Sequence, residues 1–123
     1  MSALVATPLM TTEELLALPD DDGVDRYLIR GQLREKPMSR RNRRHSRTTV
    51  NLSMLMGTWL VQRPRPRGEL LAGDAGFRLS HDPDTTMGID LAYISAELAA
   101  RSPENVYLID VAGARGDLFG GEL

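Results

Sequence analysis

The stretch Thr86-Met-Gly-Ile-Asp-Leu-Ala-Tyr-Ile-Ser95 decides how the chain is interpreted, because it places one carboxylate, that of Asp90, inside an apolar run. Ile89, Leu91 and Tyr93 are of the β-branched, aliphatic and aromatic types that favour a pleated, largely buried surface, so we predict a strand here. An ionised group in a buried strand is costly unless a metal ion or a basic side chain pairs with it. Asp90 is therefore the first candidate site residue. The alternative is a strand-end aspartate that points to water or caps a turn.

The composition is that of one globular domain. The chain has 123 residues, of which 41% are hydrophobic and 26% charged, which is enough for a single core. No run approaches the roughly 18 apolar residues of a membrane span, and the N-terminus lacks the basic and apolar regions of a signal peptide. The absence of cysteine excludes a disulfide framework and a thiolate zinc site. We expect a cytoplasmic protein that does not bind membranes.

The N-terminal third predicts a short helix and a hairpin. Thr11-Thr-Glu-Glu14 has the pattern of a capping box, and it opens a short amphipathic helix that Pro19 stops. Residues 26–36 contain two short apolar pieces on either side of Gly31, which suggests a bent strand or a tight hairpin.

The C-terminal half predicts more strands. Residues 69–80 suggest two short strands around Gly73 to Gly76, and residues 106–111 suggest a fourth strand that again contains one carboxylate, Asp110. Short connections between strands that follow a long helix predict an α/β (α+β) fold with a central sheet.

Positive charge is concentrated in one segment. Residues 40–68 contain no Asp or Glu. The segment carries eight arginines, namely Arg40, Arg41, Arg43, Arg44, Arg47, Arg63, Arg65 and Arg67. The apolar spacing predicts a helix from about residue 40 to residue 61. On a helical wheel several of these arginines gather on one side, whereas His45 falls on the face of Met56 and Trp59.

The start of this helix has two interpretations. We define the N-terminal arginine cluster as Arg40, Arg41, Arg43, Arg44 and Arg47. The cluster is either a surface that contacts nucleic-acid phosphates or a solvated face that balances the acidic remainder of the chain. His45 is either a packed core histidine or a functional group beside the arginines. Trp59 and the methionines are expected in the core.

The order of these motifs resembles the Uma-type family of restriction endonucleases in the PD-(D/E)XK nuclease superfamily. The matching stretches are Thr-Thr-Glu-Glu-Leu-Leu-Ala-Leu-Pro (11 to 19), Arg-Tyr-Leu-Ile-Arg-Gly-Gln-Leu-Arg-Glu (26 to 35), His45 at a helix start, Gly-Asp-Ala-Gly-Phe-Arg-Leu-Ser (73 to 80) and Gly-Ile-Asp-Leu-Ala-Tyr-Ile-Ser (88 to 95). The resemblance covers about residues 10 to 111. It implies a restriction-endonuclease-like mixed sheet flanked by helices and a magnesium-dependent site that cleaves DNA.

The chemistry implied by the family uses two acids and a lysine. Mg²⁺ is usually held by one or two carboxylates together with phosphate oxygens of the substrate. The ion lowers the pKa of a bound water and stabilises charge that develops on the phosphate. The resemblance implies that Asp90 and Asp110 are metal ligands on neighbouring strands, with carboxyl groups roughly 3 to 5 Å apart. It also implies that His45 is a nearby accessory group and that the N-terminal arginine cluster binds DNA.

The chain departs from the family pattern in ways that keep a second hypothesis open. Ile89 stands where the family has Pro, and Tyr27–Gly31 lacks a family Glu. A Gly-rich tail, residues 113–123, replaces a Glu-Val-x-Ser-Pro segment and a later lysine, and the only lysine of the chain is Lys36. The alternative is therefore a truncated, catalytically inactive remnant that acts as a nucleic-acid-binding or interaction module. An uncovered sheet face would also favour a homodimer.

The expected organisation has three parts. We assign residues 1–10 to a disordered or frayed N-terminus, residues 11–112 to a restriction-endonuclease-like domain that is incomplete at its C-terminus, and residues 113–123 to the Gly-rich tail.

Overall fold

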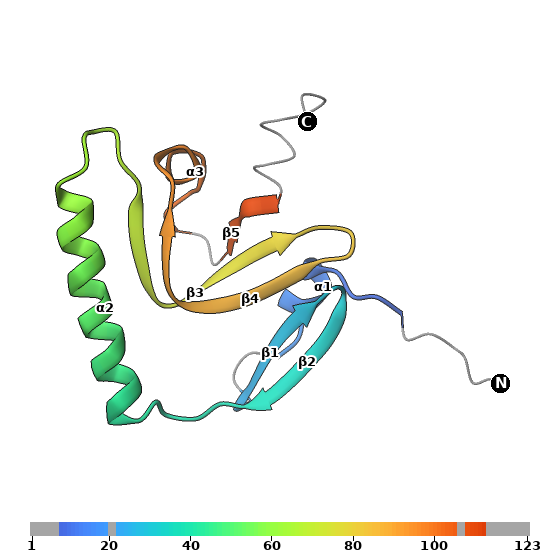
Figure 1. The fold of residues 1–123 in the computed structure, drawn as a ribbon. Helices are drawn as coiled ribbons and strands as arrows, with labels where there is room; N and C mark the ends of the chain where they lie inside the picture. Colours follow the sequence, from blue (N-terminus) through green and yellow to red (C-terminus); the bar gives the residue numbers. More distant parts are fainter. Residues whose placement is uncertain (1–7, 20–21, 106–107, 113–123) are drawn as a thin grey trace.

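The fold is a five-stranded mixed sheet flanked by helices (Figure 1), which confirms the predicted α/β class. The computed structural model describes residues 8–19, 22–105 and 108–112. The elements are α1 (Thr12–Leu16), β1 (Val24–Ile29), β2 (Gln32–Pro37), α2 (Arg43–Val61), β3 (Glu69–Ser80), β4 (Thr85–Ile94), α3 (Ala96–Arg101) and β5 (Leu108–Asp110). The strand order is β2-β1-β4-β3-β5, in which only β3 and β5 are parallel. The described residues include no helix long and apolar enough to cross a membrane.

The short helix and the hairpin predicted in the N-terminal third are confirmed. The Thr11 hydroxyl accepts from the Glu14 backbone N–H (3.2 Å), and the Glu14 carboxylate accepts from the Thr11 backbone N–H (2.9 Å), which completes the capping box of α1. β1 and β2 form a hairpin closed by Arg30 and Gly31, whose φ values of 52° and 78° fit the two-residue turn that matches strand twist. Of the predicted N-terminal segment, residues 1–7 lie outside the described residues, and Met10 donates its backbone N–H to the Gly31 carbonyl.

β3 is one long strand rather than the two predicted. Its pairing with β4 shifts register between Ala72 and Ala75, and Gly73 and Asp74 have φ values of 84° and 66°. A β-bulge of this kind absorbs extra residues without ending the ladder, which is why the glycine interrupts the sequence pattern and not the strand. The bulge faces the centre of β4. The predicted tail, residues 113–123, lies outside the described residues.

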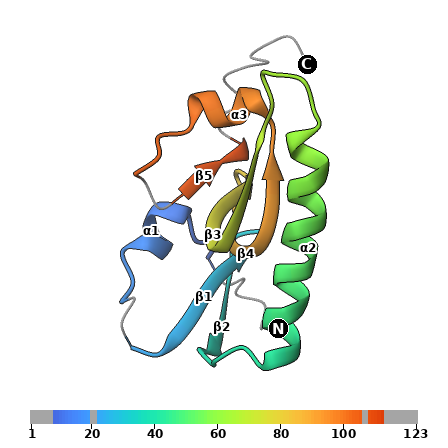
Figure 2. The same cartoon turned by 90° about the vertical axis from the view of Figure 1, so that its left-hand side faces the viewer.

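α2 lies on one side of the sheet, whereas α1 and α3 lie on the other (Figures 1 and 2). The helix α2 begins at Arg43 and not at Arg40, because Asn42 caps it and accepts a hydrogen bond from the His45 backbone N–H (2.8 Å). None of its residues is fully buried. The expectation that Trp59 and the methionines are core residues is wrong for Trp59 and Met54, whose side chains are 45% and 65% exposed.

The buried apolar residues come from both halves of the chain. They are Leu15 on α1, Leu28 on β1, Phe77 on β3 and Ile94 on β4. α1 is also fixed to the sheet through polar groups, because the Thr12 hydroxyl lies 2.7 Å from the Thr86 hydroxyl and both threonines are buried. The sheet therefore has one anchored face under α1 and a looser face under α2.

Candidate functional site

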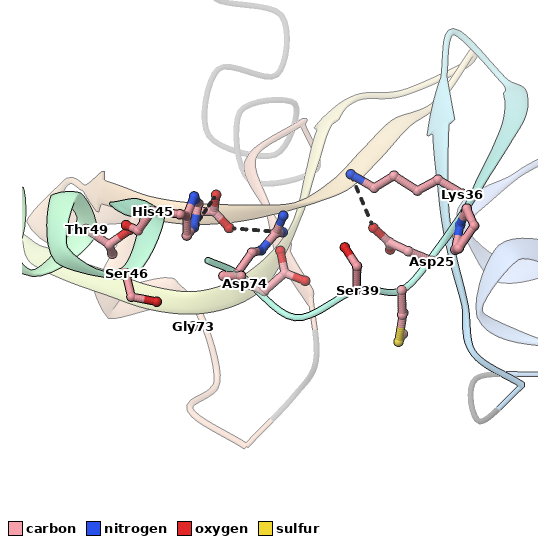
Figure 3. Close-up of a pocket in the computed structure, with 12 residues that line it drawn as sticks. Asp25, Lys36, Ser39, His45, Ser46, Thr49, Gly73 and Asp74 are labelled. Carbon is pink, nitrogen blue, oxygen red and sulfur yellow. Dashed lines mark hydrogen bonds and ion pairs between the residues drawn. The ribbon is translucent and has the colours of Figure 1, made fainter. Parts of the chain in front are cut away.

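A hollow of about 530 Å³ opens where the start of α2 meets the β1–β2 hairpin and the β3 bulge (Figure 3). We call it the carboxylate pocket. Its charged lining consists of Asp25, Lys36, Arg41, His45, Asp74 and Asp90. In Figure 3, His45 lies at one end of the group and Lys36 with Asp25 at the other, with Asp74 between them. The fold thus gathers three acids and three bases from distant parts of the sequence.

Asp90, on β4, is held loosely. Its carboxylate lies 3.6 Å from an Arg41 guanidinium nitrogen and 3.4 Å from His45 Nε2. Both distances are longer than those of well-formed charge-assisted hydrogen bonds, and the Asp90 side chain is 44% exposed. The carboxylate is therefore accessible to a ligand.

His45 reaches Asp90 because of where α2 begins. The Asn42 cap places His45 in the first turn of the helix, and its ring lies on the side of α2 that faces β4. Arg41 precedes the cap and approaches the same carboxylate from the connection that follows β2. One aspartate thus meets one basic group from the helix and one from the preceding loop.

The β3 bulge supplies a second carboxylate, that of Asp74. Gly73 and Asp74 are the unpaired residues across from Asp90, since Ala72 pairs with Leu91 and Ala75 with Ile89. A Cβ on Gly88 would lie only 2.4 Å from Asp74 Oδ1. Residues 88 and 90 share one face of β4 because they are two apart. The Asp74 carboxylate therefore occupies the space over Gly88, on the face that carries Asp90.

Asp74 was not among the sequence candidates. A signal for it existed, because a glycine followed by an aspartate inside a strand-like run is typical of a bulge that redirects a side chain.

Lys36 lines the same pocket. It pairs with Asp25 across the β1–β2 hairpin, with 3.8 Å between Nζ and Asp25 Oδ2, and its ammonium lies 5.8 Å from the centre of the Tyr27 ring. Sequence position alone placed this lysine far from Asp90. The hairpin and the pairing of β1 with β4 bring the two to one pocket.

Asp110 lies elsewhere, so the predicted placement of Asp90 and Asp110 on neighbouring strands is wrong. β3 separates β4 from β5. Asp110 pairs in register with Arg78. The Arg78 guanidinium donates from Nε to Asp110 Oδ1 (3.0 Å) and from Nη2 to Asp110 Oδ2. Arg78 in turn lies opposite Thr86, four residues from Asp90 along β4, which is roughly 13 Å of strand. The hydrogen bonds with Asp110 raise the pKa of Arg78 above its ordinary value.

All five residues of the N-terminal arginine cluster are exposed. Arg41 reaches Asp90, and Arg44 lines a second hollow beside the carboxylate pocket together with His45, Thr48 and Leu91. Among the described residues, none of the other four arginines forms an ion pair with an acid. The cluster thus presents uncompensated positive charge next to Asp90.

The acids do not form a closed metal cage. Within residues 8–19, 22–105 and 108–112, no group of three or more His, Asp or Glu side chains is arranged to hold a metal ion. Asp74 and Asp90 nevertheless supply the type of donor that Mg²⁺ uses, because this ion is usually bound by one or two carboxylates and takes its remaining ligands from water and phosphate.

Comparison of the chain with protein-family models, with curated proteins and with solved structures finds no significant match.

Proposed function

We propose that the carboxylate pocket hydrolyses phosphodiester bonds of nucleic acid with the help of a divalent cation, so that the protein is a metal-dependent DNA endonuclease of the kind its sequence resembles. The observation that supports this is the meeting of two carboxylates, Asp74 and Asp90, with the only lysine of the chain, Lys36. Two acids and a lysine in one pocket match what cation-assisted attack on a phosphodiester requires.

Each group has a role in this proposal. Asp90 and Asp74 would hold Mg²⁺. Asp74 would be the second metal ligand, a role that the sequence resemblance implied for Asp110. The ion would supply an activated water and a charge that stabilises the phosphate. Lys36 and Arg41 neutralise the phosphate oxygens, and His45 orients the Asp90 carboxylate. The N-terminal arginine cluster holds the flanking phosphates.

Cleavage of supercoiled plasmid and of a single-stranded circular DNA, each with and without Mg²⁺, tests the proposal. We expect magnesium-dependent nicking by the wild type and only background nicking by Asp90→Asn and by Asp74→Asn, because either change removes a ligand charge. Asp110→Asn is the matched control, since Asp110 is a strand aspartate outside the pocket, and it should keep most of the activity. Equal, background-level nicking of both substrates by wild type and Asp90→Asn would contradict the proposal.

The alternative is a nucleic-acid-binding module without catalysis. The observation that favours it is that Asp90 already has two basic side chains beside it, Arg41 and His45, which would have to give way to a metal. The alternative predicts binding that is indifferent to Mg²⁺ and that weakens steeply with salt. Five phosphate contacts give a log–log slope of about −4.5 on duplex DNA and about −3.5 on a single strand. Binding that is absent even at low salt would contradict both functions.

A further inference from the structure

α2 exposes apolar side chains between two basic ends. Val50, Met54, Trp59 and Val61 are each at least 45% exposed. The N-terminal arginine cluster lies at the start of the helix, and Arg63, Arg65 and Arg67 follow its end. A 19-residue helix is about 28 Å long. The whole segment from residue 40 to residue 68 contains no acid, so its complement is a polyanion with apolar surface of its own.

Two aromatic side chains, Trp59 and Tyr93, meet near the C-terminal end of α2. The rings of Trp59 and Tyr93 meet edge to face, with 5.5 Å between centroids and 78° between planes, and the Arg63 guanidinium lies 5.5 Å from the Trp59 ring centre. Gly68 makes this possible, because a Cβ there would lie 2.6 Å from the Tyr93 ring. Both rings remain more than 40% exposed.

We infer that the nucleic acid taken by the carboxylate pocket is single-stranded, and that it follows α2 so that its bases stack on the Trp59–Tyr93 pair. This inference rests on the proposed function. A duplex presents phosphates and hides its base faces, so it offers nothing to the apolar side chains of α2. A single strand presents both, and aromatic rings beside arginines are the usual surface that binds it.

Other occupants fit this surface less well. A second copy of the chain that packed α2 against α2 would bring arginines against arginines, because neither helix carries an acid. An acidic helical peptide would satisfy the arginines but would have no particular use for the Trp59–Tyr93 pair.

Fluorescence provides a direct readout, because Trp59 is the only tryptophan. The wild type is titrated with an oligothymidylate of about 16 nucleotides, at the upper end of single-strand site sizes, and with a duplex of equal length, both without Mg²⁺. We expect the single strand to quench Trp59 and to bind more tightly than the duplex.

Variants then separate stacking from charge. By anisotropy of a labelled oligothymidylate, Trp59→Leu should bind about tenfold more weakly, while its affinity for the duplex stays the same. Trp59→Phe should keep most of the single-strand affinity because it keeps a ring. Leu79→Ala removes an equally exposed apolar side chain on β3 and serves as the control, which should bind like the wild type.

Four results would overturn the inference. Equal binding of duplex and single strand, with no change in Trp59 emission, would contradict the single-strand preference. The proposed function would still stand in that case if nicking depends on Asp90. Self-association in sedimentation that Trp59→Leu abolishes would assign the surface to a second copy. Binding of an acidic helical peptide that displaces the oligothymidylate at lower concentration would assign the surface to a protein partner. Failure to bind any nucleic acid would contradict the inference and the proposed function together.

Discussion

Two aspartates at β4 have opposite surroundings. Asp84, directly before the strand, is 2% exposed and accepts hydrogen bonds from the backbone N–H groups of Thr12 (2.8 Å) and Asp82 (3.0 Å), with His81 Nδ1 at 2.9 Å. Asp90, within the strand, is 44% exposed, and in the described part of the chain the basic side chains that approach it, Arg41 and His45, lie 3.6 and 3.4 Å from its carboxylate. A carboxylate whose partners are all supplied by the fold stabilises the fold. A carboxylate with loose partners is accessible to a ligand.

The pKa of Asp84 reflects this difference. Burial, the largest single influence, raises the pKa of Asp84, but hydrogen bonds from Thr12, Asp82 and His81 together outweigh it and leave the pKa far below its ordinary value. The buried aspartate therefore stays ionised in the folded protein at neutral pH.

The largest expected effect is the loss of Asp84. Asp84→Ala should lower the free energy of unfolding by about 3 kcal/mol, because it leaves the buried N–H of Thr12 without an acceptor and leaves the Thr12 hydroxyl with Thr86 as its remaining partner, which loosens α1 on the sheet. Urea unfolding followed by circular dichroism measures this as a lower midpoint at an unchanged slope. A change below about 1 kcal/mol would mean that Asp84 is not a structural aspartate.

A smaller change in the free energy of unfolding is expected when acid protonates Asp84. Since the folded pKa of Asp84 is depressed, its contribution to stability is complete above the unfolded pKa of about 3.9 and is lost as the pH falls towards the folded pKa. Wild-type stability should therefore fall between about pH 4 and pH 2. Asp84→Asn should show a flatter dependence over this range, measured by urea unfolding at each pH. If stability falls equally with pH in the wild type and in Asp84→Asn, Asp84 is not the group that causes the fall.

The smallest effect on stability is expected at Asp90. Asp90→Asn removes two long contacts at an exposed site, so the free energy of unfolding should change by less than about 0.5 kcal/mol. Thermal unfolding of the two proteins side by side measures it. A loss as large as that of Asp84→Ala would make Asp90 a structural aspartate as well and would remove the distinction between the two regions.

Local patterns predicted most of the fold. The capping box of Thr11 and Glu14, the hairpin at Gly31 and the strand around Asp90 each depend on neighbours in sequence, and all three are present. The register of β3 was not predictable in the same way. Whether Gly73 ends a strand or bulges it depends on the pairing partner, which is β4.

The site was only partly predictable. Asp90 and His45 were candidates from the sequence, because a charge in an apolar run and a histidine at a helix start are local features, and both line the carboxylate pocket. Lys36 and Asp74 were missed because they reach the carboxylate pocket through the β1–β2 hairpin and through the β3 bulge, respectively. Asp110 was assigned as the partner of Asp90, but β3 inserts between their strands and gives it Arg78 instead. Strand order is a long-range property that spacing along the chain does not contain.

The location of a bound divalent cation tests the central claim most directly. Mn²⁺, which accepts the same oxygen ligands as Mg²⁺, is titrated into ¹⁵N-labelled protein, and paramagnetic broadening of the backbone amides is followed by NMR. We predict that broadening begins at Asp74, Gly88 and Asp90, and that Asp90→Asn abolishes it while Asp110→Asn does not. Broadening centred on Asp110, or none at millimolar Mn²⁺, would contradict the assignment of the carboxylate pocket as the cation site.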